Sequence, residues 1–146
     1  MRSYQRVDLA KEQLDVALEI FLSCKSYVSA LTLAGAAEEI FGKSLTQRGE
    51  KTTLQHEHSI IAPVEEMLQH KPYNWKEFIA EKNRVRNAAK HMSDKAESTI
   101  SADIEDEALW LIVRACDNYR RLGFEPTSLM LEFDNWFFEN IVGLES

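Results

Sequence analysis

The chain has 146 residues, of which 45% are hydrophobic and 28% charged, and its formal net charge is −7. This balance is typical of one globular domain with its own core, and it excludes an intrinsically disordered chain. Only five glycines and three prolines are present, which disfavours a turn-rich β-sandwich or barrel. We therefore expect a single all-α domain over residues 1–146, an up-and-down bundle of five to six helices.

Apolar residues recur at helical spacing in six segments. In chain order these segments are residues 7–22, 26–47, 54–70, 74–91, 102–122 and 127–142. Asp8, Asn74 and Ser101 are placed to cap the first, fourth and fifth segments. Pro63 falls inside the third segment, where a helix kinks or splits. No stretch alternates with period 2 between turn signals, so no strand is predicted.

The last segment has two apolar faces. One face is predicted to join the core, and it consists of Leu129, Phe133, Trp136, Phe137 and Ile141. Leu131 and Phe138 lie on the opposite face of the same helix. These two side chains either form a surface for a protein partner or pack beneath a loop.

The longest uncharged run indicates a buried helix rather than a membrane span. Residues 26–37 form this run of 12, whereas a bilayer needs about 20 apolar residues. The N-terminus lacks the apolar run of a secretory signal. Cys24 and Cys116 stand singly in apolar patterns and are expected to be buried thiols. We expect a cytoplasmic protein that does not associate with membranes.

Basic residues gather in one short segment of this acidic chain. Residues 1–79 contain 9 Lys and Arg against 11 Asp and Glu, residues 80–96 contain 5 against 2, and residues 97–146 contain 3 against 11. The five are Lys82, Arg84, Arg86, Lys90 and Lys95. Phosphate contacts supply most non-specific affinity for nucleic acids, so the acidic balance disfavours a broad binding face. A local basic island still fits a small anionic site.

Arg86 is predicted to project along a buried helix face. Phe78 and Val85 define that face by their spacing. In a continuous helix Arg86 would lie about 20° from Trp75, on the same apolar side. Because a buried guanidinium without a counter-charge is costly, an anionic group should meet it.

The second segment offers this anionic group. Glu38 lies on its inner face, and the small residues Ala34 and Gly35 beside it admit a close neighbour. Glu38 or Glu39 is therefore the expected partner of Arg86. Such a pair is also found as a purely structural salt bridge that sets the register of two helices.

The run from Arg86 to His91, with Asn87 directly after the arginine, resembles the signature of the HEPN superfamily, in which four to six residues stand between an Arg and a following His. Residues 30–43 also resemble the acidic second helix of several HEPN branches, including one associated with abortive infection by phage. The resemblance covers about residues 7–122. It implies a HEPN-like bundle that forms a homodimer. It also implies a metal-independent endoribonuclease of the toxin–antitoxin or phage-defence type.

The resemblance also assigns roles to individual residues. Arg86 and His91 would be catalytic, with Asn87, Glu38 and Glu39 in support, and Lys82, Arg84 and Lys90 would bind flanking phosphates. An imidazole can exchange a proton with an RNA hydroxyl near neutral pH. A guanidinium can hold the scissile phosphate through two parallel hydrogen bonds. An RNA substrate and an antitoxin or another protein partner are the expected partners.

No cofactor or metal is expected. His56 and His58 stand two residues apart and therefore point to different faces of a helix, which is poor spacing for a metal pair. A second function stays open beside RNA cleavage. In it the chain is a non-catalytic helical dimer that serves as a protein- or nucleotide-binding module.

Overall fold

The computed structural model describes residues 1–143 and contains only helices and loops over that range. Its elements are α1 (Arg6–Leu22), α2 (Tyr27–Gln47), α3 (Thr53–Gln69), α4 (Trp75–Lys82), α5 (Arg84–Lys90), α6 (Ile104–Arg121), α7 (Ser128–Phe137) and a π-helical turn η1 (Phe138–Val142). The prediction of an all-α helical bundle is confirmed.

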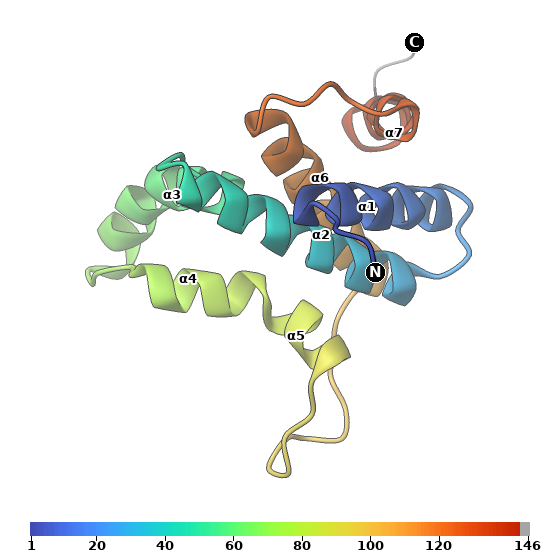
Figure 1. The fold of residues 1–146 in the computed structure, drawn as a ribbon. Coiled ribbons are helices and arrows are strands. Elements are labelled where there is room, and N and C mark those ends of the chain that lie inside the picture. Colours follow the sequence, from blue (N-terminus) through green and yellow to red (C-terminus); the bar gives the residue numbers. More distant parts are fainter. Residues whose placement is uncertain (144–146) are drawn as a thin grey trace.

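Helix α2 is the centre of the bundle. It packs mainly against α1 and α6, while α7 lies against α1 (Figure 1). Its buried side chains are mostly small or aliphatic, namely Ala30, Leu31, Ala34, Ala37, Phe41 and Leu45. Alanine lets neighbouring helices approach closely, so α2 can be covered on several sides at once.

Helices α3, α4 and α5 extend to one side of this centre. Figure 1 shows α3 and α4 running side by side as an arm, with α5 returning beneath α2. The connection after α5, residues 91–103, projects beyond the bundle as an exposed loop (Figure 1). Because α5 returns beneath α2, the basic segment lies next to the acidic side of that helix.

The capping predictions are right at one position and wrong at two. Asn74 caps α4 by accepting the backbone N–H three residues on, at 2.9 Å. Helix α1 begins one residue earlier than expected, so its N-cap is Gln5 and Asp8 falls in the first turn. Helix α6 is capped by Asp103 rather than Ser101, and the Asp103 carboxylate accepts a backbone N–H at 3.1 Å.

The segment predicted as one helix over residues 74–91 is two helices. The break falls at Asn83, whose φ is −103° and ψ is 4°. The Asn83 side chain is buried and its Oδ1 accepts a hydrogen bond from Arg114 Nη2 at 3.2 Å. Pro63, by contrast, does not end α3. An interior proline removes a single backbone hydrogen bond.

The C-terminal part follows the prediction in outline. Phe133 is buried, but Ile141 is 44% exposed because the regular helix ends at Phe137 and a π-helical turn follows. Leu131 and Phe138 are 53% and 51% exposed. They therefore lie on the surface and do not pack beneath a loop.

The two cysteines differ in their surroundings. Cys116 is buried, as expected, and burial raises the pKa of its thiol to about 12. Cys24 is exposed, against expectation, because α1 ends at Leu22 and the chain turns at this residue with φ of 55°. Within residues 1–143, no helix has the length and apolar composition needed to cross a bilayer.

Candidate functional site

Arg86 and Glu38 form an ion pair in the interior, as the sequence predicts. Arg86 Nη1 donates to Glu38 Oε2 at 3.1 Å, and the two side chains are 12% and 8% exposed. On the predicted buried face, Phe78 and Val85 are each 1% exposed. Trp75 is 39% exposed, because the break at Asn83 separates its helix from that of Arg86.

Gly35 makes room for the Arg86 side chain. A Cβ added at Gly35 would lie 2.7 Å from Arg86 Cδ and 2.9 Å from Arg86 Cγ. The small-residue position on α2 therefore admits an arginine side chain from α5. Gly35 has only a hydrogen where other residues have a side chain. The Arg86 side chain can therefore cross α2 at this position, and its guanidinium contacts Glu38 one helical turn further along.

A second buried arginine lies next to this pair. Arg114 on α6 is 8% exposed, and its Nη1 donates to the Lys82 carbonyl at 3.5 Å. Burial lowers the pKa of Arg114 and the negative charge of Glu38 partly offsets this. For Glu38, burial raises the pKa, and the positive charges of Arg114 and Arg86 oppose that shift. The Glu38 carboxylate thus experiences the positive charge of two guanidinium groups, and it forms its ion pair with that of Arg86.

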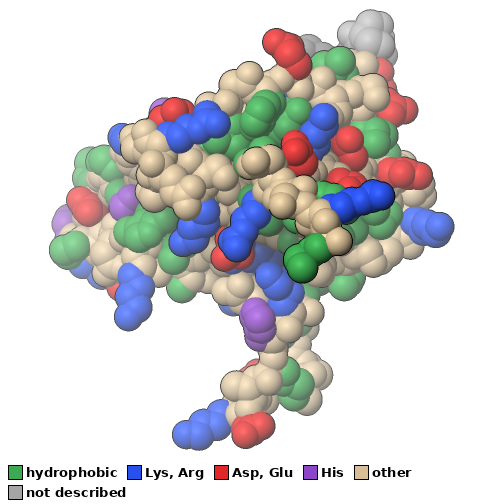
Figure 2. Space-filling model, viewed as in Figure 1, with side chains coloured by type: hydrophobic (Ala, Val, Ile, Leu, Met, Phe, Trp, Pro, Cys, Tyr) green, Lys and Arg blue, Asp and Glu red, His purple; other side chains and the backbone are tan. Residues whose placement is uncertain are grey.

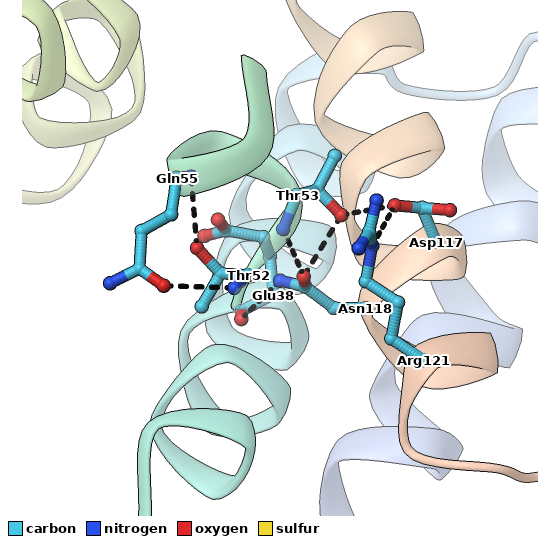
Figure 3. Close-up of polar contacts among 7 residues, drawn as sticks. All are labelled: Glu38, Thr52, Thr53, Gln55, Asp117, Asn118 and Arg121. Atoms are coloured by element: carbon cyan, nitrogen blue, oxygen red, sulfur yellow. Dashed lines mark hydrogen bonds and ion pairs between the residues drawn. The ribbon is translucent and has the colours of Figure 1, made fainter. Parts of the chain in front are cut away.

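The backbone at Glu38 is held by a polar network that joins α2, α3 and α6 (Figure 3). Asn118 is fully buried, and its Nδ2 donates to the Glu38 carbonyl at 3.4 Å. Its Oδ1 accepts from the backbone N–H of Thr53 at 2.9 Å. The start of α3 is further fixed by Thr52, which forms a capping box with Gln55.

His91 leaves the helix at a point where its imidazole can face solvent. Helix α5 ends at Lys90, and His91 has extended backbone angles, φ of −134° and ψ of 138°. The side chain is exposed, and so is that of Asn87. Asn87 Oδ1 lies 3.5 Å from Arg86 Nη2. The end of α5 therefore presents His91 and Asn87 at the surface, and Asn87 contacts the Arg86 guanidinium.

Lys90 lines a groove of about 680 Å³ that is rich in positive charge. Its other charged side chains are Arg6, Lys43, Arg48 and Glu39. Figure 2 shows several Lys and Arg side chains on the face that carries the N-terminal segment and α5. Sequence reasoning missed Arg6, Lys43 and Arg48, because nothing local distinguishes them from other surface cations.

The remaining predicted residues lie elsewhere. Lys82, Arg84 and Arg86 line a separate pocket beside α6. Lys82 Nζ forms an ion pair with Glu57 Oε1 at 2.5 Å, and Arg84 Nη2 donates to the Ser101 carbonyl at 3.3 Å. Glu39 is exposed in the groove with Lys90, so the partner of Arg86 is Glu38 rather than Glu39. Lys82, Arg84 and Arg86 thus line one hollow and Glu39 and Lys90 line another. The other predicted residues, Glu38, Asn87 and His91, line neither of the two.

Among residues 1–143, no group of three or more His, Cys, Asp or Glu side chains is arranged to hold a metal ion. The chain matches no family model, no curated protein and no solved structure.

Proposed function

We propose that this chain is a metal-independent endoribonuclease of the HEPN type, acting as a homodimer in a toxin–antitoxin or phage-defence role. One observation supports this above the others. The short helix α5 contains an Arg86 guanidinium held by Glu38 at 3.1 Å, and it ends so that His91 is exposed five residues later. Arg86 supplies a fixed cation, and His91, which directly follows α5, supplies a group that can transfer a proton.

The chemistry of RNA cleavage fits these two groups. His91 removes the proton of a ribose 2′-hydroxyl or returns one to the leaving 5′-oxygen. Arg86 stabilises the negative charge that develops on the phosphate. The ion pair with Glu38 limits the motion of the guanidinium. The Arg86 side chain therefore loses less conformational entropy when the substrate binds.

The groove beside Lys90 supports the proposal independently. Its walls contain four cations and one carboxylate, although the chain as a whole has a net charge of −7. Phosphate contacts supply most of the affinity for a nucleic-acid backbone. An RNA strand bound along this groove would pass the end of α5, where His91 lies.

A second candidate function is a non-catalytic dimeric module that binds a protein or a nucleotide. It is favoured by the 12% exposure of the Arg86 side chain, which limits direct contact with a phosphate. The exposed Leu131 and Phe138 would then form the surface for a protein partner. In this function the Arg86–Glu38 pair only joins α5 to α2.

The test is cleavage of single-stranded and folded RNA by the purified protein in EDTA. We expect cleavage by the wild type and a loss of at least about 100-fold in His91→Ala, which is the usual contribution of a general acid or base. His56→Ala is the matched control, because His56 is also exposed but lies on α3. Arg86→Lys should also lose activity, because an ammonium cannot reproduce two parallel hydrogen bonds.

Light scattering of the same samples reports the oligomeric state, which we expect to be a dimer. Absence of cleavage by a folded wild-type dimer would favour the binding module. Equal activity of His91→Ala and His56→Ala would exclude His91 as a catalytic group.

A further inference from the structure

The pocket between α6 and the α4–α5 pair is a second hollow with chemistry of its own. Its volume is about 640 Å³, which lies in the range of small-molecule sites. Lys82, Arg84 and Arg86 line it from α4 and α5, and Glu107, Trp110 and Arg114 line it from α6. Glu57, Glu81 and Asp106 also line it. The pocket therefore combines four cations with four carboxylates and a large aromatic ring.

Trp110 is held in a fixed position although it is 45% exposed. Its indole Nε1 donates to Asp106 Oδ1 at 3.1 Å, and Phe137 meets the ring edge-on at a centroid distance of 5.8 Å. A rigid, exposed indole is a suitable platform for a nucleobase, because every base can stack on its face.

The charged groups around Trp110 are incompletely paired. The Nε atoms of Arg86 and Arg114 are buried and have no hydrogen-bond partner within residues 1–143. Glu107 is half-buried, and within residues 1–143 its carboxylate forms no hydrogen bond and no ion pair, although its charge acts on Arg114. Buried polar groups without partners are costly, so a ligand that supplies both an anion and N–H donors would stabilise this pocket.

We propose that this pocket binds a guanine nucleotide of the RNA substrate, next to the phosphate that is cleaved. Guanine stacks on Trp110, and its N1–H and N2–H donate to the Glu107 carboxylate. Its phosphate faces Arg84 and Arg86. A carboxylate accepts two parallel hydrogen bonds, and guanine presents two adjacent donors on its Watson–Crick edge. This assignment rests on the proposed function, because it makes Trp110 and Glu107 the specificity residues of the same enzyme.

The experiment measures binding apart from cleavage. Fluorescence anisotropy gives the affinity of His91→Ala protein for three labelled oligouridines in EDTA: one with a central guanosine, one with a central inosine, and one of uridine only. Inosine lacks the N2 amino group. Unlabelled guanosine monophosphate, added as a competitor, reports whether the free nucleotide enters the same pocket.

We expect the guanosine oligonucleotide to bind more tightly than the other two. Trp110→Leu should weaken its binding about tenfold, a typical effect of losing one stacked base. Glu107→Gln should abolish the preference for guanosine over inosine. Trp75→Leu is the matched control, because Trp75 is 39% exposed and lies outside the pocket, and it should bind like the parent protein.

The outcomes separate this inference from the proposed function. A guanosine preference that depends on Trp110, in a wild-type chain that does not cleave RNA, would support the pocket and reject the nuclease. Cleavage by the wild type together with unchanged binding in Trp110→Leu would reject the pocket alone. Equal losses in Trp110→Leu and Trp75→Leu would also overturn the assignment, and absence of RNA binding would reject both.

Discussion

The aliphatic part of Arg86 lies directly against Gly35. An added Cβ at Gly35 would approach Arg86 Cδ to 2.7 Å and Leu111 Cδ2 to 3.3 Å. The arginine cannot simply swing away, because its guanidinium is held by Glu38. This glycine therefore decides whether the central ion pair can form.

Gly35→Ala should destabilise the fold by about 1–3 kcal/mol, the usual cost of overpacking a core. Gly42→Ala is the matched control on the same helix, since its added Cβ would meet its nearest neighbours at 3.6 Å. That change should stabilise the protein by about 0.5–1 kcal/mol, because alanine is the better helix former. Urea unfolding measures the free energy of unfolding of both variants. Equal effects of the two substitutions would show that Arg86 does not occupy this space.

The ion pair itself can be measured by a double-mutant cycle. Glu38→Leu leaves Arg86 buried without its partner, and it should lower the free energy of unfolding by about 3 kcal/mol. Arg86→Met leaves Glu38 with Arg114 as the nearby cation. The double variant should cost less than the sum of the single variants, by roughly 1–3 kcal/mol. Strict additivity would mean that the two groups do not interact.

Asn118 should be important for stability although it lies outside the proposed site. Asn118→Ala leaves the Thr53 N–H and the Glu38 carbonyl without their partner, at a cost of about 2–3 kcal/mol. Asn135→Ala, at an exposed position of α7, should change stability by less than about 0.5 kcal/mol. Thermal unfolding compares the two. A loss at Asn135 as large as that at Asn118 would contradict this account.

Asp117 should make the fold sensitive to acid. Burial alone would raise the pKa of Asp117, but hydrogen bonds from Arg121 and Thr53 and the charges of Arg121 and Arg120 lower it below 3.8 overall. A lowered folded-state pKa stabilises the protein above the unfolded value, and that contribution is lost as the pH falls through the folded value. The stability advantage of the wild type over Asp117→Asn should therefore be complete near pH 6 and shrink below about pH 4. An advantage that grows on acidification would be inconsistent with the lowered pKa.

The groove beside Lys90 should determine how RNA binding depends on salt. Lys43→Gln removes one cation from the wall of the groove, and it should weaken the binding of oligouridine. The slope of log K against log salt concentration should become about one less steep. Lys76→Gln on α4 is the matched control, because Lys76 is exposed and lies outside this groove. Affinity titrations between low and moderate salt report both slopes. Identical slopes for the two variants would place the RNA elsewhere.

Several features of this protein were predictable from the sequence alone. The all-α class and the central position of α2 follow from the apolar spacing of residues 26–47, and periodicity is a local property of the chain. The pairing of Arg86 with a carboxylate on α2 was also predictable. A buried guanidinium requires a counter-charge, and α2 has two acidic residues, at positions 38 and 39.

Only the tertiary structure decided which groups come together. The choice of Glu38 over Glu39 depends on the rotation of α2 against α5, and the break at Asn83 depends on Arg114, a residue 31 positions further along the chain. Arg6, Lys43 and Arg48 join Lys90 in one groove although they are widely separated in sequence. Helix packing brings distant side chains together, and no local pattern records which faces will meet.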